Sequence, residues 1–159
     1  MNSAMDQKDI KIISALRANA RVSLTKMSKR TNIPISTIHD RIKYYRDGVI
    51  KKYTSLLDFS VLGFHSRAHV MFKVKKECKE ALLSFLSKHQ NVNALFKINN
   101  GYDFLVEAIF RNIKDLEEFT ELLEERFNVR DKQVYYLIED IKREEFMADP
   151  EIIDLVKIY

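Results

Sequence analysis

Short hydroxyl side chains and basic side chains are interleaved between Ser36 and Lys52, a combination suited to hydrogen bonding with duplex DNA. Ser36 and Thr37 are small enough to contact base edges near the start of a helix, and Arg41 can donate two parallel hydrogen bonds to guanine or grip a phosphate. We expect the following residues to contact DNA: Ser36, Thr37, His39, Asp40, Arg41, Lys43, Tyr44, Lys51, Lys52, Lys26, Lys29 and Arg30.

The charge of the chain is divided unevenly. Residues 1–64 hold 12 Lys and Arg against 5 Asp and Glu, a net charge of +7, whereas residues 65–159 hold 15 against 18, a net charge of −3. A basic half joined to a mildly acidic half is typical of a polyanion-binding module fused to a second domain. The alternatives are a solvated, lysine-rich surface and a three-helix packing unit without a nucleic-acid role.

The elements that would position these side chains are three short helices. Ile10, Ile13 and Leu16 recur at helical spacing after Asp6, whose carboxylate can cap the first helix. Ser23 is the N-cap candidate of a second helix. Asn32, Ile33 and Pro34 interrupt that helix, because proline cannot donate a helical hydrogen bond and biases its predecessor away from helical geometry.

The third helix of this pattern begins after Pro34 and ends at Gly48, where we expect a left-handed C-terminal conformation. Its inward residues are predicted to be Ile35, Ile38, Ile42 and Tyr45. Residues 49–54 favour β structure and are basic, which predicts a short wing strand. Two helices joined by a tight turn, with a third helix free to enter the major groove, form a helix-turn-helix.

The second half of the sequence alternates strands and helices. We expect strands at 68–74, 92–98, 104–110 and 134–141, and helices at 77–89 and around 116–123. This βαββαβ order is typical of a ferredoxin-like domain. Asn100 and Gly101 supply the positive φ angles that a tight hairpin turn requires.

The fold class predicted is therefore α+β, with an N-terminal winged helix-turn-helix domain followed by a ferredoxin-like βαββαβ sandwich domain. The predicted boundaries are 1–57 for the helix-turn-helix domain, 58–64 for a hinge, 65–142 for the second domain and 143–159 for a tail. Asp149 and Pro150 resemble the cap and first residue of a helix in that tail.

Several motifs of this sequence resemble the Lrp/AsnC, or feast/famine, family of archaeal and bacterial transcription regulators. The resemblance rests on Asp9-Ile10-Lys11-Ile12-Ile13 with Leu16, Arg21-Val22-Ser23, Ser36-Thr37-Ile38-His39-Asp40-Arg41-Ile42, Gly48-Val49-Ile50-Lys51-Lys52-Tyr53-Thr54, Leu57-Asp58 and Leu62-Gly63. It covers essentially the whole chain. It implies double-stranded DNA as a partner and a second domain that pairs protomers and often binds amino acids. A homodimer, or an octamer built as a tetramer of dimers, follows as the expected assembly.

The hairpin between the two middle strands departs from the family pattern. The family usually has Thr-Gly-x-x-Asp there, and this chain has Asn99, Asn100, Gly101, Tyr102 and Asp103, which keeps the aspartate and moves the glycine by one position. These five residues are the candidates for binding an amino-acid effector. The alternative is a hairpin with a structural role alone.

An enzyme is the first rival interpretation, because some proteins with this two-domain plan resemble sirohaem decarboxylases and use histidines. His65 and His69 share a strand face but lie about 13 Å apart along it, too far to bind one metal ion. The single cysteine, Cys78, excludes a disulfide framework and a thiolate-rich zinc site. We expect no catalytic residues, no metal site and no cofactor. A metabolite sensor that does not bind DNA is the second rival.

The remaining composition indicates a cytoplasmic protein without a membrane partner. Residues 1–10 carry charges and no apolar run, unlike a secretion signal, and no apolar stretch approaches the roughly 20 residues of a membrane-spanning helix. Hydrophobic residues make up 46% of the chain, which is enough to form a core.

Overall fold

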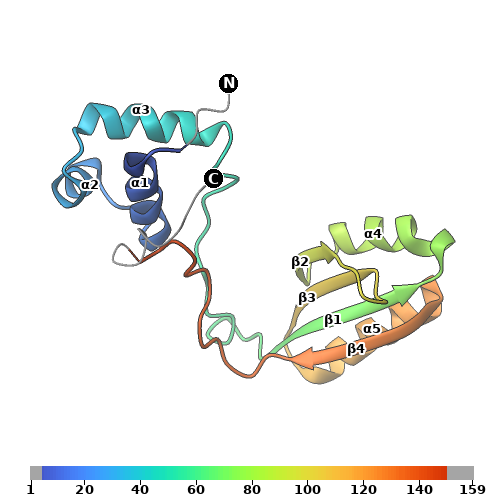
Figure 1. Ribbon diagram of the computed structural model, residues 1–159. Helices are drawn as coiled ribbons and strands as arrows, with labels where there is room; N and C mark the ends of the chain where they lie inside the picture. Colours follow the sequence, from blue (N-terminus) through green and yellow to red (C-terminus); the bar gives the residue numbers. More distant parts are fainter. Residues whose placement is uncertain (1–4, 150–159) are drawn as a thin grey trace. The chain divides into compact units, whose positions relative to one another are not determined.

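The computed structural model describes residues 5–149, and these divide into two compact units (Figure 1). The first unit comprises residues 5–55 together with 141–149, and the second comprises residues 56–140. No helix in the described part of the chain is long and apolar enough to cross a bilayer.

Three helices form the first unit: α1 (Gln7–Ala18), α2 (Leu24–Thr31) and α3 (Ile35–Arg46). The predicted caps are confirmed. The Asp6 carboxylate accepts a hydrogen bond from the Asp9 N–H, and the Ser23 hydroxyl accepts one from the Lys26 N–H. Asp9 returns the first of these by accepting from the Asp6 N–H, which completes a capping box.

Four side chains fill the centre of this helical unit, with no more than 1% of their surface exposed: Ile12, Met27, Ile38 and Tyr45. Burying a side chain of this size contributes roughly 1.5–3 kcal/mol. Since each helix supplies at least one of them, the core fixes the position of α3 against α1 and α2.

Three details of the first unit differ from prediction. Ile35 is 45% exposed, because it is the first residue of α3 and lies beyond the edge of the core. Gly48 is not left-handed; Asp47 caps α3 with φ −88° and ψ 0°. Residues 49–54 form no strand, because no described strand runs beside them to supply hydrogen-bonding partners.

Residues 141–149 return to this helical unit. The Arg17 guanidinium donates hydrogen bonds to the Glu144 carbonyl (2.7 Å), the Glu144 carboxylate (3.0 Å) and the Phe146 carbonyl (3.0 Å). Met147 packs against the helical core. Residues 143–149 form no helix, and the predicted tail helix, which begins at Pro150, lies outside the described residues.

The second unit is a four-stranded antiparallel sheet with two helices on one face. Its strands are β1 (Ser66–Val74), β2 (Val92–Lys97), β3 (Phe104–Phe110) and β4 (Val129–Tyr136), in the order β2-β3-β1-β4. Its helices are α4 (Lys79–Lys88), preceded by a single 3₁₀ turn, η1 (Lys76–Cys78), and α5 (Ile113–Phe127). The predicted βαββαβ order is confirmed, and Figure 1 shows its path from β1 in green to β4 in orange.

The two faces of the sheet follow from the strand register. Val70 of β1 lies opposite Val106 of β3, and both are buried with Leu82 of α4 and Leu116 and Leu123 of α5 in one core. The opposite face carries Met71, Leu105 and Phe96 in one row and His69, Glu107 and Tyr135 in the next.

The last strand was predicted at 134–141 and lies at Val129–Tyr136 instead. The segment from Val129 to Gln133 contains four charged or amide side chains and lacks the apolar alternation that signals a strand. Pairing with β1 decides its conformation, since Val74 lies opposite Val129 and Val70 opposite Val134. Beyond the strand, Ile138 is 98% exposed.

Candidate nucleic-acid interface

The turn between α2 and α3 is fixed by local hydrogen bonds. Asn32 ends α2 in the left-handed conformation, with φ 55°. The Ser28 hydroxyl donates to the Ile33 carbonyl (2.7 Å), and Pro34 occupies the N-cap of α3 without a side-chain hydrogen bond. The tight turn therefore presents the first residues of α3 at the surface.

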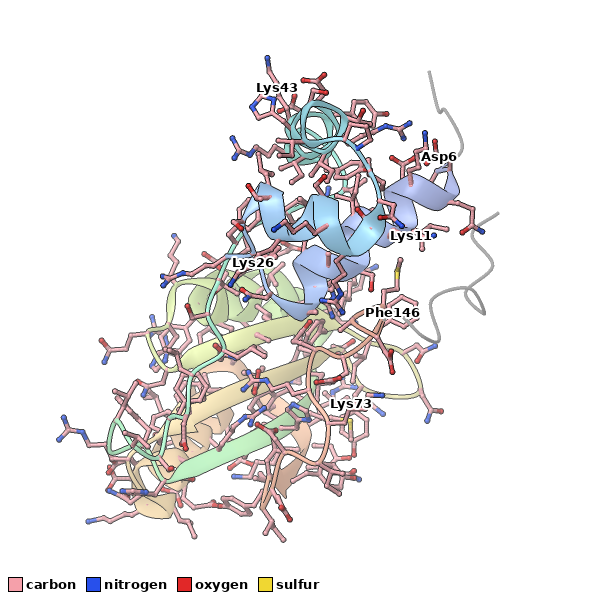
Figure 2. All side chains as sticks on the ribbon, turned by 90° about the vertical axis from the view of Figure 1, so that its left-hand side faces the viewer. Asp6, Lys11, Lys26, Lys43, Lys73 and Phe146 are labelled. Atoms are coloured by element: carbon pink, nitrogen blue, oxygen red, sulfur yellow. The ribbon has the colours of Figure 1, made fainter. Side chains whose placement is uncertain are left out.

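Ten of the twelve predicted contact residues are exposed. On α3 and after it they are Ser36, His39, Asp40, Lys43, Tyr44, Lys51 and Lys52, and on α2 they are Lys26, Lys29 and Arg30. Thr37 is half-buried at the first turn of α3. Figure 2 shows Lys43 projecting outward from α3 and Lys26 from α2. We define the α2–α3 surface by these ten residues and Thr37. It holds seven charged side chains, of which six are lysine or arginine and one is aspartate.

Arg41 behaves differently from the rest of the predicted set. Its guanidinium donates to the Asp6 carboxylate (2.9 Å) and to the Asp9 carboxylate on the neighbouring helix α1. Its side chain is 34% exposed. These two ion pairs engage both terminal nitrogens of the Arg41 guanidinium, direct it toward α1 and tie α3 to the start of that helix.

Asp9 is the centre of this network. It is 5% exposed, and besides Arg41 it accepts a hydrogen bond from the buried hydroxyl of Tyr45. Burial, and then the hydrogen bond to Asp9, raise the pKa of Tyr45, so the phenol stays protonated and donates. The pKa of Asp6 is lowered, mainly by the hydrogen bond from the Asp9 N–H. Burial raises it in part, and the Arg41 guanidinium lowers it further.

This network was not predicted from the sequence, and neither was the exposed cation Arg46 in the last turn of α3. A signal for the network was present. Arg41 and Tyr45 are four residues apart and so share a helix face, and Asp9 is a charged residue in an otherwise apolar stripe. For Arg46 the signal was its position three residues after Lys43, near the end of the same basic helix.

The five predicted effector residues form the turn between β2 and β3. Asn100 and Gly101 have φ of 61° and 91°, which confirms the predicted positive angles. Asp103 is engaged within its own chain: its N–H donates to the Phe72 carbonyl (2.8 Å), and its carboxylate accepts from the Val74 N–H (3.0 Å) and pairs with Lys79.

The other side chains of this turn leave hydrogen-bonding capacity for a ligand. The Tyr102 hydroxyl donates to the Asp131 carboxylate (2.7 Å), while Asn99, Asn100 and Gly101 are exposed. Burial opposes the charge of Asp103, but the bonds from Lys79 and Val74 outweigh it and lower the pKa of this carboxyl. Asp103 therefore holds the hairpin to β1 as an anion.

Among the described residues, no group of three or more His, Cys, Asp or Glu side chains lies close enough to hold a metal ion. His39 lies on α3 beside Asp40 (3.3 Å), and His89 packs against Phe119 with ring centres 4.6 Å apart. The arrangement of the α2–α3 surface is one for binding, with hydrogen-bond donors spread along a helix.

Both units match known families. Residues 5–46 match the family model of the AsnC-type helix-turn-helix domain, and residues 67–146 match that of the Lrp/AsnC ligand binding domain. The chain is 33% identical over 124 residues to the HTH-type transcriptional regulator FL11 of Pyrococcus horikoshii, covering 77% of this chain and 82% of that protein.

Solved structures agree with this likeness. The transcriptional regulator NMB0573 of Neisseria meningitidis, solved as a complex with L-Met, is 25% identical with a TM-score of 0.80, covering 87% of this chain and 93% of that one. LrpC of B. subtilis is 19% identical with a TM-score of 0.78, covering 87% and 96%, and supports the fold alone.

Proposed function

Because the chain belongs to the Lrp/AsnC family of DNA-binding transcription regulators, we propose that its α2–α3 surface is the part that reads DNA. In this proposal α3 enters the major groove, where Ser36, Thr37 and His39 contact base edges, and Lys43 and Tyr44 extend the contact along the groove. Asp40 accepts from a base amino group at the same surface.

The observation that carries this proposal is the exposure of ten polar or basic side chains on α2, on α3 and in the segment after α3. Lys26, Lys29 and Arg30 are placed to contact phosphates from α2, and Lys51 and Lys52 from the following segment. We assign Arg41 a positioning role instead of guanine contact, since Asp9 and Asp6 hold the two terminal nitrogens of its guanidinium.

We propose a homodimer formed through the second domain, predicted at residues 65–142. The sheet face opposite α4 and α5 exposes Phe96 by 52% and Tyr135 by 52%, and no described helix covers it. A second copy of this face would bury these side chains. Static light scattering at micromolar concentration should give twice the chain mass or a multiple, including the eight copies of a tetramer of dimers; the mass of one chain would refute the proposal.

We also propose an amino-acid effector at the β2–β3 turn, with the exposed polar groups of Asn99, Asn100, Gly101 and Tyr102 as its contacts and Asp103 as the residue that holds the turn. The support is the match to the ligand binding domain and the similarity to a regulator solved with L-Met. The proposed role of the chain is regulatory, in the cytoplasm, without catalysis.

The salt dependence of DNA binding tests the phosphate contacts. Replacing Lys51 and Lys52 together with Ala should weaken binding on all sequences alike and reduce the slope of log affinity against log salt by about 2, because each lysine releases about one counterion. The control replaces Lys76 and Lys97 of the second unit with Ala, which removes the same charge. An unchanged slope in the first variant would refute phosphate contact by these lysines.

A further inference from the structure

A groove between α4 and α5 has no role in the function proposed above. Its volume is about 360 Å³, within the range of small-molecule sites. The α4 side consists of residues at successive helical turns, Ala81, Ser84, Phe85 and Lys88. His89, the C-cap residue of α4, closes one end, and Arg126 and Phe127 of α5 form the other side. None of the five turn residues 99–103 lines it, so it is separate from the proposed effector turn.

The charge of the groove has one sign. Lys88 and Arg126 line it, and no acidic side chain does. Neither cation forms an ion pair with any residue in the described part of the chain. The Arg126 guanidinium lies instead over two aromatic rings, 5.0 Å from the ring centre of Phe85 and 5.3 Å from that of Phe127. This position orients the cation without neutralising it.

His89 adds a neutral donor. Its Nδ1 accepts a hydrogen bond from the Asn91 N–H (3.3 Å), so the proton of the neutral imidazole lies on Nε2. Burial lowers the pKa of His89, which keeps the ring neutral at physiological pH. The ring packs 5.4 Å from Phe85 and 4.6 Å from Phe119, so its plane is fixed by aromatic neighbours.

We propose that this groove binds a small aromatic organic acid. The carboxylate would accept hydrogen bonds from the Lys88 ammonium and the Arg126 guanidinium, with His89 Nε2–H as a further donor. The flat apolar part would lie against Phe85 and Phe127. Two unpaired cations beside an aromatic wall complement a ligand that combines a negative charge with a flat ring, and the volume admits a molecule of that size.

An NMR titration of the full chain with phenylpropionate tests this, with phenylpropanamide as the uncharged comparison. We expect phenylpropionate to shift the ring protons of His89, identified by their loss in His89→Gln, together with amides of α4 and α5. The Kd of phenylpropanamide should be higher by about tenfold or more, because this probe lacks the charge that the two cations recognise.

The test variant is the double substitution Lys88→Gln with Arg126→Gln. Its control is Lys76→Gln with Arg130→Gln, which removes the same charge elsewhere on the second unit. The first pair should raise the Kd for phenylpropionate about tenfold or more, and the second less than about twofold. If the first pair lowers the melting temperature, Lys88→Gln alone replaces it, because Lys88 is exposed at the end of α4. Equal Kd values for the two probes, equal effects of the two pairs, or shifts at residues 99–103 instead would overturn the proposal.

Discussion

Replacing Asp9 with Asn should destabilise the first unit far more than its position near the N-terminus suggests. The carboxylate is 5% exposed and accepts hydrogen bonds from three donors: the Arg41 guanidinium, the Tyr45 hydroxyl and the Asp6 N–H. The amide of Asn keeps one acceptor and places a donor group where a second acceptor is needed. The result is a conflict within a site that water scarcely reaches.

The magnitude follows from the bonds lost. A hydrogen bond to a charged group contributes about 1.5–3 kcal/mol, and an unsatisfied buried hydroxyl costs about 1–3 kcal/mol. Arg41 is one-third exposed and keeps its bond to Asp6, which reduces its share of the loss. We therefore expect Asp9→Asn to lower the free energy of unfolding by about 3 kcal/mol. Tyr45→Phe, which removes one donor and leaves no charge unpaired, should cost about 1 kcal/mol.

Native-state hydrogen exchange of the α1 and α3 amides is the appropriate assay, because it reports the opening of the first unit separately from the second. The control is Asp40→Asn, a change of the same kind at a carboxylate whose side chain is 80% exposed, and it should alter the opening free energy by less than about 0.5 kcal/mol. If Asp9→Asn and Asp40→Asn have equal effects, the network does not hold α3 in place.

Two further changes test other contacts of the structure. Arg17→Ala should speed hydrogen exchange of the amides in residues 144–148 by roughly tenfold, since it removes three exposed hydrogen bonds; Arg21→Ala is the matched control, and an equal rate in both would mean that Arg17 does not hold the segment. The lowered pKa of Asp103 means that its charge stabilises the fold above the ordinary pKa of 3.8 and that this contribution is lost as the pH falls below it. Asp103→Asn should therefore reduce stability at neutral pH and flatten the acid side of the stability curve, and an unchanged acid limb would refute that role.

The elements of this fold were predictable where local signals and tertiary packing agree. The caps at Asp6 and Ser23 and the positive φ angles at Asn100 and Gly101 depend on interactions within a few residues, and all were predicted. The β3 strand was placed at its observed bounds, because Phe104–Phe110 is apolar apart from Glu107 and is nearly all buried.

The failures have a common physical origin in partners that are distant in sequence. β4 begins at Val129 because β1 pairs with it, and its own charged residues gave no sign of that. Likewise, nothing in the spacing of residues indicated that Arg17 holds a segment more than 120 positions away.

The exposure of the candidate DNA-contacting residues was predicted better than their contacts within the chain. Exposure follows from the helical period once the inward face of α3 is known, which is why Ser36, His39 and Lys43 lie at the surface as expected. The orientation of Arg41 depends on Asp6 and Asp9 at the start of α1, and the sequence of α3 alone does not indicate these partners.

Selection of bound fragments from random duplex DNA tests whether the α3 helices of a dimer read a specific sequence. We expect enrichment of a pseudo-palindrome whose half-sites lie about one helical turn apart, or a multiple of that. Thr37→Ala and His39→Ala should each relax the preference at a few base positions and leave the others unchanged. Recovery of fragments with no shared motif, or the same motif from wild type and both variants, would contradict this expectation.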